Sequence, residues 1–205
     1  SNKDMFVNIP QFPNFKALNL DDQADINTLI TQHPPYSDYN FISMWTWDVD
    51  QSLQVSQLHN NLVVIFSDYV TSDNFLSFLG TNKVADTVDV LLTYSNNNNL
   101  GKELKLIPEV VVSALKSSDN NFYIEEDDTN HDYVLSVDLM KSMAGKKLGP
   151  KRNFINRYKR LYEDRTEVKR LDLTIDTVEK QIIDLFITWQ KKAKKTCAET
   201  EDEYQ

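Results

Sequence analysis

The residues best placed to do chemistry in this chain form one basic segment. Eight lysines and arginines, and no acidic residue, lie between Lys141 and Arg160. Such cations bind phosphate or carboxylate groups through charge-assisted hydrogen bonds. Gly149-Pro150 within the segment is typical of a helix start, where free backbone N–H groups and the positive end of the dipole favour anions. We predict an anion site formed by Lys146, Lys147, Lys151, Arg152, Asn153 and Arg157.

The helix that this segment opens is predicted to be amphipathic. At about 100° per residue, its apolar residues group on one side. The other side is occupied by Arg152, Asn153, Asn156, Arg157, Lys159 and Arg160. The apolar stripe consists of Phe154, Ile155, Tyr158, Leu161 and Tyr162. We expect the stripe to be buried and the basic face to be exposed. A solvated basic face without any ligand stays an open alternative, because charge runs are usually plain surface.

No catalytic residue is identified from the sequence. Asp38, Asp48 and Asp50 flank tryptophans, and one of them could serve as a general base, but helix capping or solvation is the commoner role. The aromatic residues around them are more often core packing than a wall for an acyl group. This cluster consists of Tyr36, Tyr39, Phe41, Trp45 and Trp47.

No metal site is predicted. His33, His59 and His131 are scattered, without a metal-ligand spacing. The acidic loop of residues 125–128 lacks the alternating ligands and the glycine of a calcium loop, so we interpret it as a solvated turn. A role of the single cysteine, Cys197, as a nucleophile has little support from its surroundings.

Charge and composition exclude some classes of protein. The formal net charge of −9 argues against non-specific nucleic-acid binding over a broad surface, although a local basic site remains compatible with it. No apolar run is long enough for a transmembrane segment, and the first residues lack a signal-peptide core. With one cysteine, the chain fits a reducing cytoplasm. We expect a cytoplasmic protein and leave peripheral contact with a membrane open.

Helix and strand patterns alternate along the chain, which indicates a mixed α/β (α+β) class. An extended lead-in is predicted for residues 1–20, and helices are predicted for about 21–32, 81–94, 108–116, 137–144 and the stretch from 149. A further helix is predicted to be capped by Thr174, with Ile175, Val178, Ile182, Leu185, Phe186 and Trp189 on one face. Strands are predicted for residues 52–58, 62–68, 75–79, 103–107, 122–125, 132–136 and 166–172. His59-Asn60-Asn61 is a hairpin signal.

Two segments resemble a bacterial family related to the C-terminal domain of phosphatidylglycerol lysyltransferase. The first is "PPYSDYNFISMWTWD", where Ser37, Tyr39, Phe41, Trp45 and Trp47 match. The second runs from Asp132-Tyr133 through "LMKSMAGKKLGPKRNFINRYKRLY". It matches at Asp132, Tyr133, Gly145, Lys146, Lys147, Lys151, Arg152 and Asn153. The two matches lie in the order of the family, and the resemblance spans most of residues 15–195.

The resemblance implies a GNAT-like (acyl-CoA N-acyltransferase) fold, with a central, mostly antiparallel sheet flanked by helices. Residues 21–195 would form the first of two tandem domains, and residues 196–205 an acidic tail or the start of a linker. Relatives of this kind are similar to Fem-type enzymes and transfer an aminoacyl group from a charged tRNA. No glycine-rich pyrophosphate arm occurs here, so no cofactor is expected apart from aminoacyl-tRNA as donor.

Two functions follow as expectations. The first is the N-terminal domain of an aminoacyl-tRNA-dependent acyltransferase, completed by a second GNAT-like domain in cis. Its basic segment would hold phosphate of tRNA or of an anionic lipid head group. The second is a non-catalytic anion-binding or homo-oligomeric module with a degenerate acyltransferase fold. The donor, the acceptor and the oligomeric state do not follow from the sequence.

Overall fold

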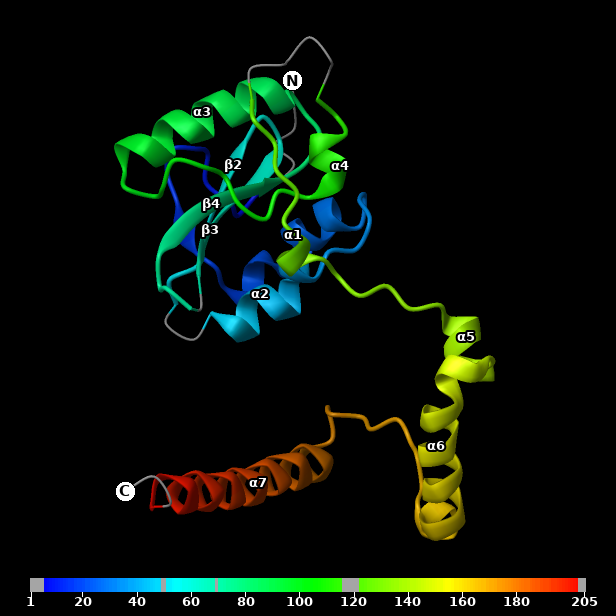
Figure 1. The fold of residues 1–205 in the computed structure, drawn as a ribbon. Helices are drawn as coiled ribbons and strands as arrows, with labels where there is room; N and C mark the ends of the chain where they lie inside the picture. Colours follow the sequence, from blue (N-terminus) through cyan, green and yellow to red (C-terminus); the bar gives the residue numbers. More distant parts are fainter. Residues whose placement is uncertain (1–5, 49–50, 69, 116–121, 203–205) are drawn as a thin grey trace. The chain divides into compact units, whose positions relative to one another are not determined.

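The chain forms two compact units, residues 1–134 (unit 1) and residues 135–205 (unit 2). The computed structural model describes residues 6–48, 51–68, 70–115 and 122–202, with side chains as far as Ala193. Figure 1 shows a sheet with helices in unit 1 and helices in unit 2. The domain boundaries expected from the resemblance, 1–20, 21–195 and 196–205, differ from this division and stay predictions.

Unit 1 is built around an open sheet of four strands. These are β1 (Lys16–Ala17), β2 (Gln54–Leu58), β3 (Asn61–Ser67) and β4 (Asn74–Leu79), which are antiparallel neighbours in that order. The predicted hairpin is confirmed. His59 and Asn60 form its turn with φ of 54° and 62°, a conformation that Asn tolerates better than most residues.

Helices cover the sheet on both faces, with α3 (Val84–Asn97) on one face and α1 (Gln23–Ile30) and α2 (Phe41–Trp47) on the other (Figure 1). A short helix α4 (Glu109–Val112) follows α3. Single 3-10 turns are η1 (Leu20–Asp22), η2 (Ser37–Tyr39) and η3 (Asp128–Asn130). The helices predicted for about 21–32 and 81–94 are confirmed, whereas the one predicted for 108–116 is helical only at Glu109–Val112. The mixed α/β class with an antiparallel sheet is confirmed.

The start of unit 1 is tied down by polar contacts that the sequence did not predict. Asn19 caps the first helical turn, and its side chain accepts a hydrogen bond from the Asp21 N–H at 3.0 Å. Asp22 is fully buried and pairs with Lys16 Nζ at 2.5 Å. Phe6, Ile9 and Leu18 reach the core from the expected lead-in, so this segment is part of the fold.

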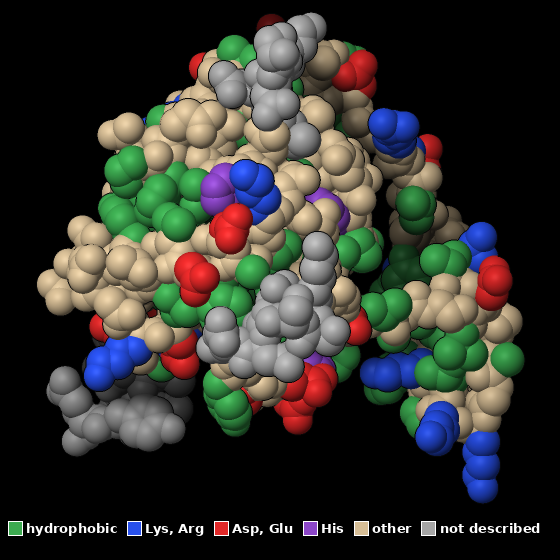
Figure 2. Space-filling view, turned by 90° about the horizontal axis from the view of Figure 1, so that it is seen from above, with side chains coloured by type: hydrophobic (Ala, Val, Ile, Leu, Met, Phe, Trp, Pro, Cys, Tyr) green, Lys and Arg blue, Asp and Glu red, His purple; other side chains and the backbone are tan. Residues whose placement is uncertain are grey.

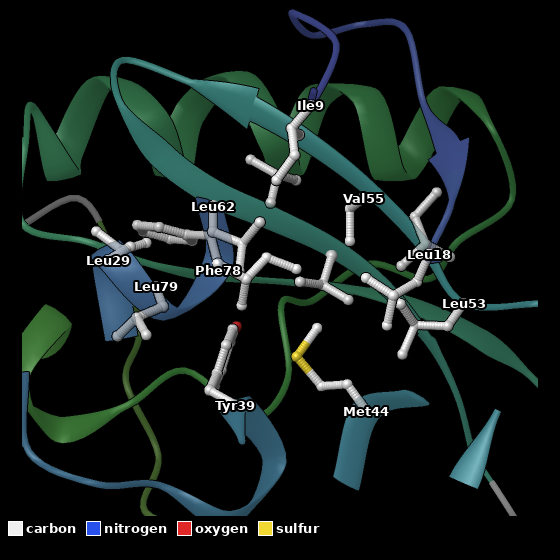
Figure 3. Packing of buried hydrophobic residues seen from close by; sticks show 14 of the residues in the cluster. Ile9, Leu18, Leu29, Tyr39, Met44, Leu53, Val55, Leu62, Phe78 and Leu79 are labelled. Carbon is white, nitrogen blue, oxygen red and sulfur yellow. The ribbon is translucent and has the colours of Figure 1, made fainter. Parts of the chain in front are cut away.

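The core of unit 1 lies on both sides of the sheet. Leu62, Val63 and Val64, consecutive on β3, are all fully buried, which explains their continuous apolar run. Figure 3 shows Tyr39 and Met44 pointing from η2 and α2 toward the strands. The Tyr39 hydroxyl donates to Ser77 Oγ at 2.7 Å, and Ser77 Oγ donates to the Leu106 carbonyl at 3.0 Å. This chain of hydrogen bonds satisfies the buried polar groups.

Unit 2 consists of helices in its described residues. They are α5 (Val137–Ser142), α6 (Gly149–Tyr162) and α7 (Asp176–Asp202), with 3-10 turns η4 (Lys146–Leu148) and η5 (Glu163–Arg165). The predicted helices are confirmed. Thr174 does not cap α7, because its N–H and hydroxyl both donate to the Asp172 carboxylate in the preceding turn.

Four predicted strands are wrong: residues 103–107, 122–125, 132–136 and 166–172 are irregular. A strand needs a partner for its backbone groups, and an alternating pattern does not supply one. In the first of these segments, the Lys105 N–H donates to the Leu76 carbonyl of β4 at 3.1 Å, while Leu104 and Ile107 pack against the core. That segment is held by side-chain burial and not by a ladder.

Candidate functional site

The basic segment begins in a short helix and a tight turn. The Ser136 side chain accepts a hydrogen bond from the Leu139 N–H at 3.3 Å and caps α5. Met143 ends α5 in the left-handed region at φ 48°, and Gly145 follows at φ 91°. The chain then turns through η4 into α6, with Pro150 in the first turn, where its missing N–H costs nothing.

Arg152 fastens this turn to α6. Its guanidinium donates to the carbonyls of Met143 and Gly145, to the latter at 2.8 Å, and its side chain is half-buried. These bonds satisfy carbonyls at the end of α5. Of the six predicted site residues, Arg152 is therefore the one that holds the loop in place, and its guanidinium is partly engaged before any ligand binds.

The other predicted site residues face solvent. Lys146, Lys147, Lys151, Asn153 and Arg157 are exposed. None of the eight cations from Lys141 to Arg160 forms an ion pair with a described acidic side chain, whereas Lys169 and Lys180 further along unit 2 do. Basic and hydrophobic side chains lie next to one another on the α5–α6 segment, at the right of Figure 2. Charges without internal partners are available to an external anion.

The charge of the chain is divided unequally between the units. Unit 1 holds 6 of the 22 Lys and Arg residues and 19 of the 31 Asp and Glu residues, a formal net charge of −13. Unit 2 holds 16 and 12 of them, a net charge of +4. The overall acidity of the chain thus belongs to unit 1, and it gives no argument against anion binding by unit 2.

The apolar stripe of α6 is exposed, contrary to the prediction that it would be buried. Phe154 is 68% exposed, and the other four residues are exposed as well. The apolar face of α7 is also largely open: Ile175, Ile182, Leu185, Phe186 and Trp189 are exposed. An amphipathic pattern predicts an apolar face but not the surface that covers it, and the described part of unit 2 contains no buried residue.

Within unit 1, one hydrogen bond links Ser37 of the first resembling segment to Asp132, the first residue of the second. The Ser37 N–H donates to Asp132 Oδ2 at 2.9 Å, across 95 residues of sequence. Hydrogen bonds from Ser37 hold the pKa of Asp132 below its ordinary value. Neighbouring Asp38 is desolvated by the protein around it and lies near the charge of Asp132, and both effects raise its pKa.

The three aspartates near the tryptophans, Asp38, Asp48 and Asp50, differ in their surroundings. Asp48 Oδ1 accepts a hydrogen bond from the Leu53 N–H at 2.9 Å and thereby closes the loop between α2 and β2. Asp50 lies outside the described residues, as does the side chain of Cys197. Asp38 stays exposed and its pKa is raised, which makes it the candidate general base of the two described carboxylates.

The aromatic cluster divides between core and surface. Tyr39 and Phe41 are buried, and the Tyr36 hydroxyl accepts from the Val110 N–H at 3.2 Å, so the core interpretation holds for these residues. Trp47, in contrast, is 82% exposed, and Trp45 is exposed to a smaller extent. The sequence pattern did not distinguish the buried aromatic residues from the exposed ones.

The histidines do not converge on one place. His59 Nδ1 lies 3.0 Å from Thr87 Oγ1, and burial lowers the pKa of His33. His131 Nε2 is 3.3 Å from Glu126 and 4.0 Å from Asp128, and all three side chains are exposed. Exposed acidic groups of this kind are common without a metal ion, so this cluster supports no metal assignment.

An open hollow lies at the C-terminal end of α6, away from the predicted site. It is lined by Lys159, Arg160, Leu161, Glu163, Asp164 and Arg165. Arg165 lies over the Tyr162 ring at 5.5 Å and donates to the Leu161 carbonyl at 2.6 Å. Because carboxylates and cations mix there, this hollow is a weaker anion site than the basic segment.

Comparison of the chain with protein-family models, with curated proteins and with solved structures finds no match. No helix among the described residues combines the length and the apolar character that crossing a membrane requires.

Proposed function

We propose that this protein binds a phosphate-bearing ligand, of tRNA or of an anionic lipid, through Lys146, Lys147, Lys151 and Arg157. The observation that carries the proposal is that these exposed cations have no ion pair with a described acidic side chain. Binding a phosphate costs such cations little free energy, because they give up water and counterions and do not have to break an ion pair within the protein. Arg152 contributes by fixing the loop, and Asn153 by its place in the first turn of α6.

The finer proposal is that the chain is the N-terminal GNAT-like part of an aminoacyl-tRNA-dependent acyltransferase related to phosphatidylglycerol lysyltransferase. The antiparallel sheet covered by helices is compatible with such a fold. Within unit 1, Asp38 is the candidate base, beside the hydrogen bond between Ser37 and Asp132. A second GNAT-like domain, in cis or in a homo-oligomer, would complete catalysis.

The alternative is a non-catalytic anion-binding or homo-oligomeric module. One observation favours its non-catalytic form: residues 141–160 contain no aspartate, glutamate or histidine. Such a segment can hold a phosphate but does not by itself offer a proton acceptor.

Binding is tested with a fourfold alanine variant at Lys146, Lys147, Lys151 and Arg157. We expect its affinity for tRNA or for phosphatidylglycerol vesicles to fall on the order of a hundredfold at low salt, with a shallower salt dependence. The matched control replaces Lys102, Lys169, Arg170 and Lys180 by alanine, which changes the charge equally. Equal affinities of the two variants would refute the proposed site.

Transfer is tested separately from binding. The protein is incubated with tRNA carrying a labelled amino acid and with phosphatidylglycerol, and label in the lipid is measured. Transfer that is lost in Asp38→Asn supports the acyltransferase proposal. Binding of both substrates without any transfer supports the non-catalytic alternative.

A further inference from the structure

The apolar residues of α6 form an exposed arc along the helix. At about 100° per residue, Phe154, Ile155, Tyr158, Leu161 and Tyr162 fall within an arc of about 120°. We propose that α6 lies flat on an anionic lipid surface, with this arc in the acyl boundary. The inference rests on the proposed function, because it uses the same cations, and it selects a membrane surface as the phosphate source.

Two cations of α6 border this arc, one on each side, and a third, Lys151 in the first turn, falls within it. By the same helical geometry, Arg157 lies about 40° beyond Leu161, and Lys159 lies about 40° beyond Ile155. Both side chains are exposed. Long basic side chains in this position keep their charge at the level of the lipid phosphates while their stems cover apolar surface. An apolar arc with a cation on each edge is the pattern of helices that lie in the plane of a bilayer surface.

The length of α6 fits lying on a membrane and not crossing one. Its 14 residues extend about 21 Å, well short of the hydrocarbon core of a bilayer. Its C-terminal end is fixed by two contacts: the Tyr158 hydroxyl lies 2.8 Å from Thr166 Oγ1, and Arg165 covers the Tyr162 ring. Tyrosine rings, with an apolar body and a polar tip, are favoured at the head-group level.

Charge favours a lipid surface over two other occupants of this arc, a second copy of α6 and RNA. Two copies of α6 packed face to face would bring like charges together, since the segment from Lys141 to Arg160 holds eight cations and no acid. RNA would match the cations but would leave the apolar arc in water. An anionic bilayer offers negative charge at its surface and hydrocarbon directly beneath, so it complements both features at once.

The test is flotation of the full chain with vesicles of phosphatidylcholine alone or of equimolar phosphatidylcholine and phosphatidylglycerol. We expect binding to the anionic vesicles only. Phe154→Ser removes apolar contact without changing charge and should weaken binding about tenfold. Arg157→Glu should weaken binding to the anionic vesicles by at least as much. Added salt should further reduce the vesicle binding of each variant.

The matched controls make the same kinds of substitution at exposed positions outside α6. Tyr123→Ser removes an aromatic side chain that is also exposed, and Lys102→Glu reverses an exposed charge of unit 1. Both should bind vesicles as the unchanged chain does. Circular dichroism checks that each variant keeps its helix signal. If the signal is retained, a loss of binding comes from the changed surface and not from unfolding.

The remaining outcomes separate this inference from the proposed function. Binding of tRNA without binding of vesicles would overturn the inference and leave the proposed function standing. Binding of neither would overturn both. Vesicle binding that is insensitive to Phe154→Ser would mean that no apolar arc inserts, and the inference fails. Sedimentation that shows self-association abolished by Phe154→Ser, without vesicle binding, would assign the arc to a second copy.

Discussion

The two units of this chain bury their apolar residues to opposite extents. In unit 1, β3 alone contributes four buried residues in a row, from Leu62 to Ile65, and helices cover the sheet on both faces. In unit 2, the described part of the chain has no buried residue at all, although α6 and α7 both carry apolar faces. The formal net charges of the units also differ: −13 for unit 1 and +4 for unit 2.

This difference shows what an amphipathic pattern can establish. A helix with an apolar face needs a complementary surface, but its sequence does not say whether the surface comes from its own chain. In unit 1 the sheet supplies that surface. In unit 2 the faces of α6 and α7 are left for something outside the described residues. Unit 1 therefore has a packed core, whereas the described part of unit 2 leaves the apolar faces of α6 and α7 exposed.

The largest predicted effect tests this contrast with one substitution in each unit. Phe78→Ala, in the centre of β4 and fully buried, should lower the free energy of unfolding by about 3–5 kcal/mol, because it leaves a cavity. Phe154→Ala on α6 should change it by less than about 0.5 kcal/mol. Urea titration measures both. A comparable cost at Phe154 would mean that its side chain is covered in solution, and the contrast would break.

A smaller effect comes from two glycines with positive φ, one in each unit. Gly80 has φ 137°, and a Cβ there would collide with Asn61, whose amide bonds to Asn82 and Thr87 hold the turn after β4. Gly80→Ala should cost about 2–4 kcal/mol. Gly145 has φ 91° with open space around it, so Gly145→Ala should cost only about 1 kcal/mol of backbone strain. Thermal unfolding measures the loss of stability in both variants. An equal loss would show that Asn61 moves aside and relieves the collision at position 80.

The smallest effect is the opposed pH dependence of two carboxylates in unit 1. The pKa of Asp132 is lowered, so its contribution to stability is present above the ordinary Asp range and is lost as pH falls through the lowered value. The pKa of Asp38 is raised, so its contribution is present at low pH and is lost as pH rises through the raised value.

At neutral pH, Asp132→Asn should therefore destabilise the fold slightly and Asp38→Asn should stabilise it slightly. Each change should be less than about 1 kcal/mol, because solvent screens these surface groups. Unfolding free energies measured from acidic to neutral pH check the signs. Two variants with the same sign would argue against the interaction of these groups with each other.

Much of the fold of unit 1 could be predicted from local signals. Three elements follow from such signals: the hairpin turn from Asn60, β3 from its apolar run, and α3 from the spacing of its apolar residues. The two-residue strand β1 was missed, because Pro10 and Pro13 near it suggest only an extended segment. The wrongly predicted strands have the correct alternation, but pairing is a long-range property that alternation does not contain.

The candidate site could be predicted in part. The cations of the basic segment and the start of α6 at Gly149 follow from residue type and from the position of Pro150. The role of Arg152 in holding the loop carbonyls does not, because it depends on the left-handed conformation of Met143 and the turn at Gly145. The contact between Ser37 and Asp132 spans 95 residues and leaves no local signal.

The unequal distribution of lysine and arginine also decides where a protease such as trypsin would find its cleavage sites. Residues 17–82, which include α1, α2 and all three long strands, contain no lysine or arginine. Unit 2 offers 16 such residues, and those of α6 are exposed apart from the half-buried Arg152. Brief digestion should therefore remove the basic helices first and leave the sheet and its covering helices as a resistant fragment.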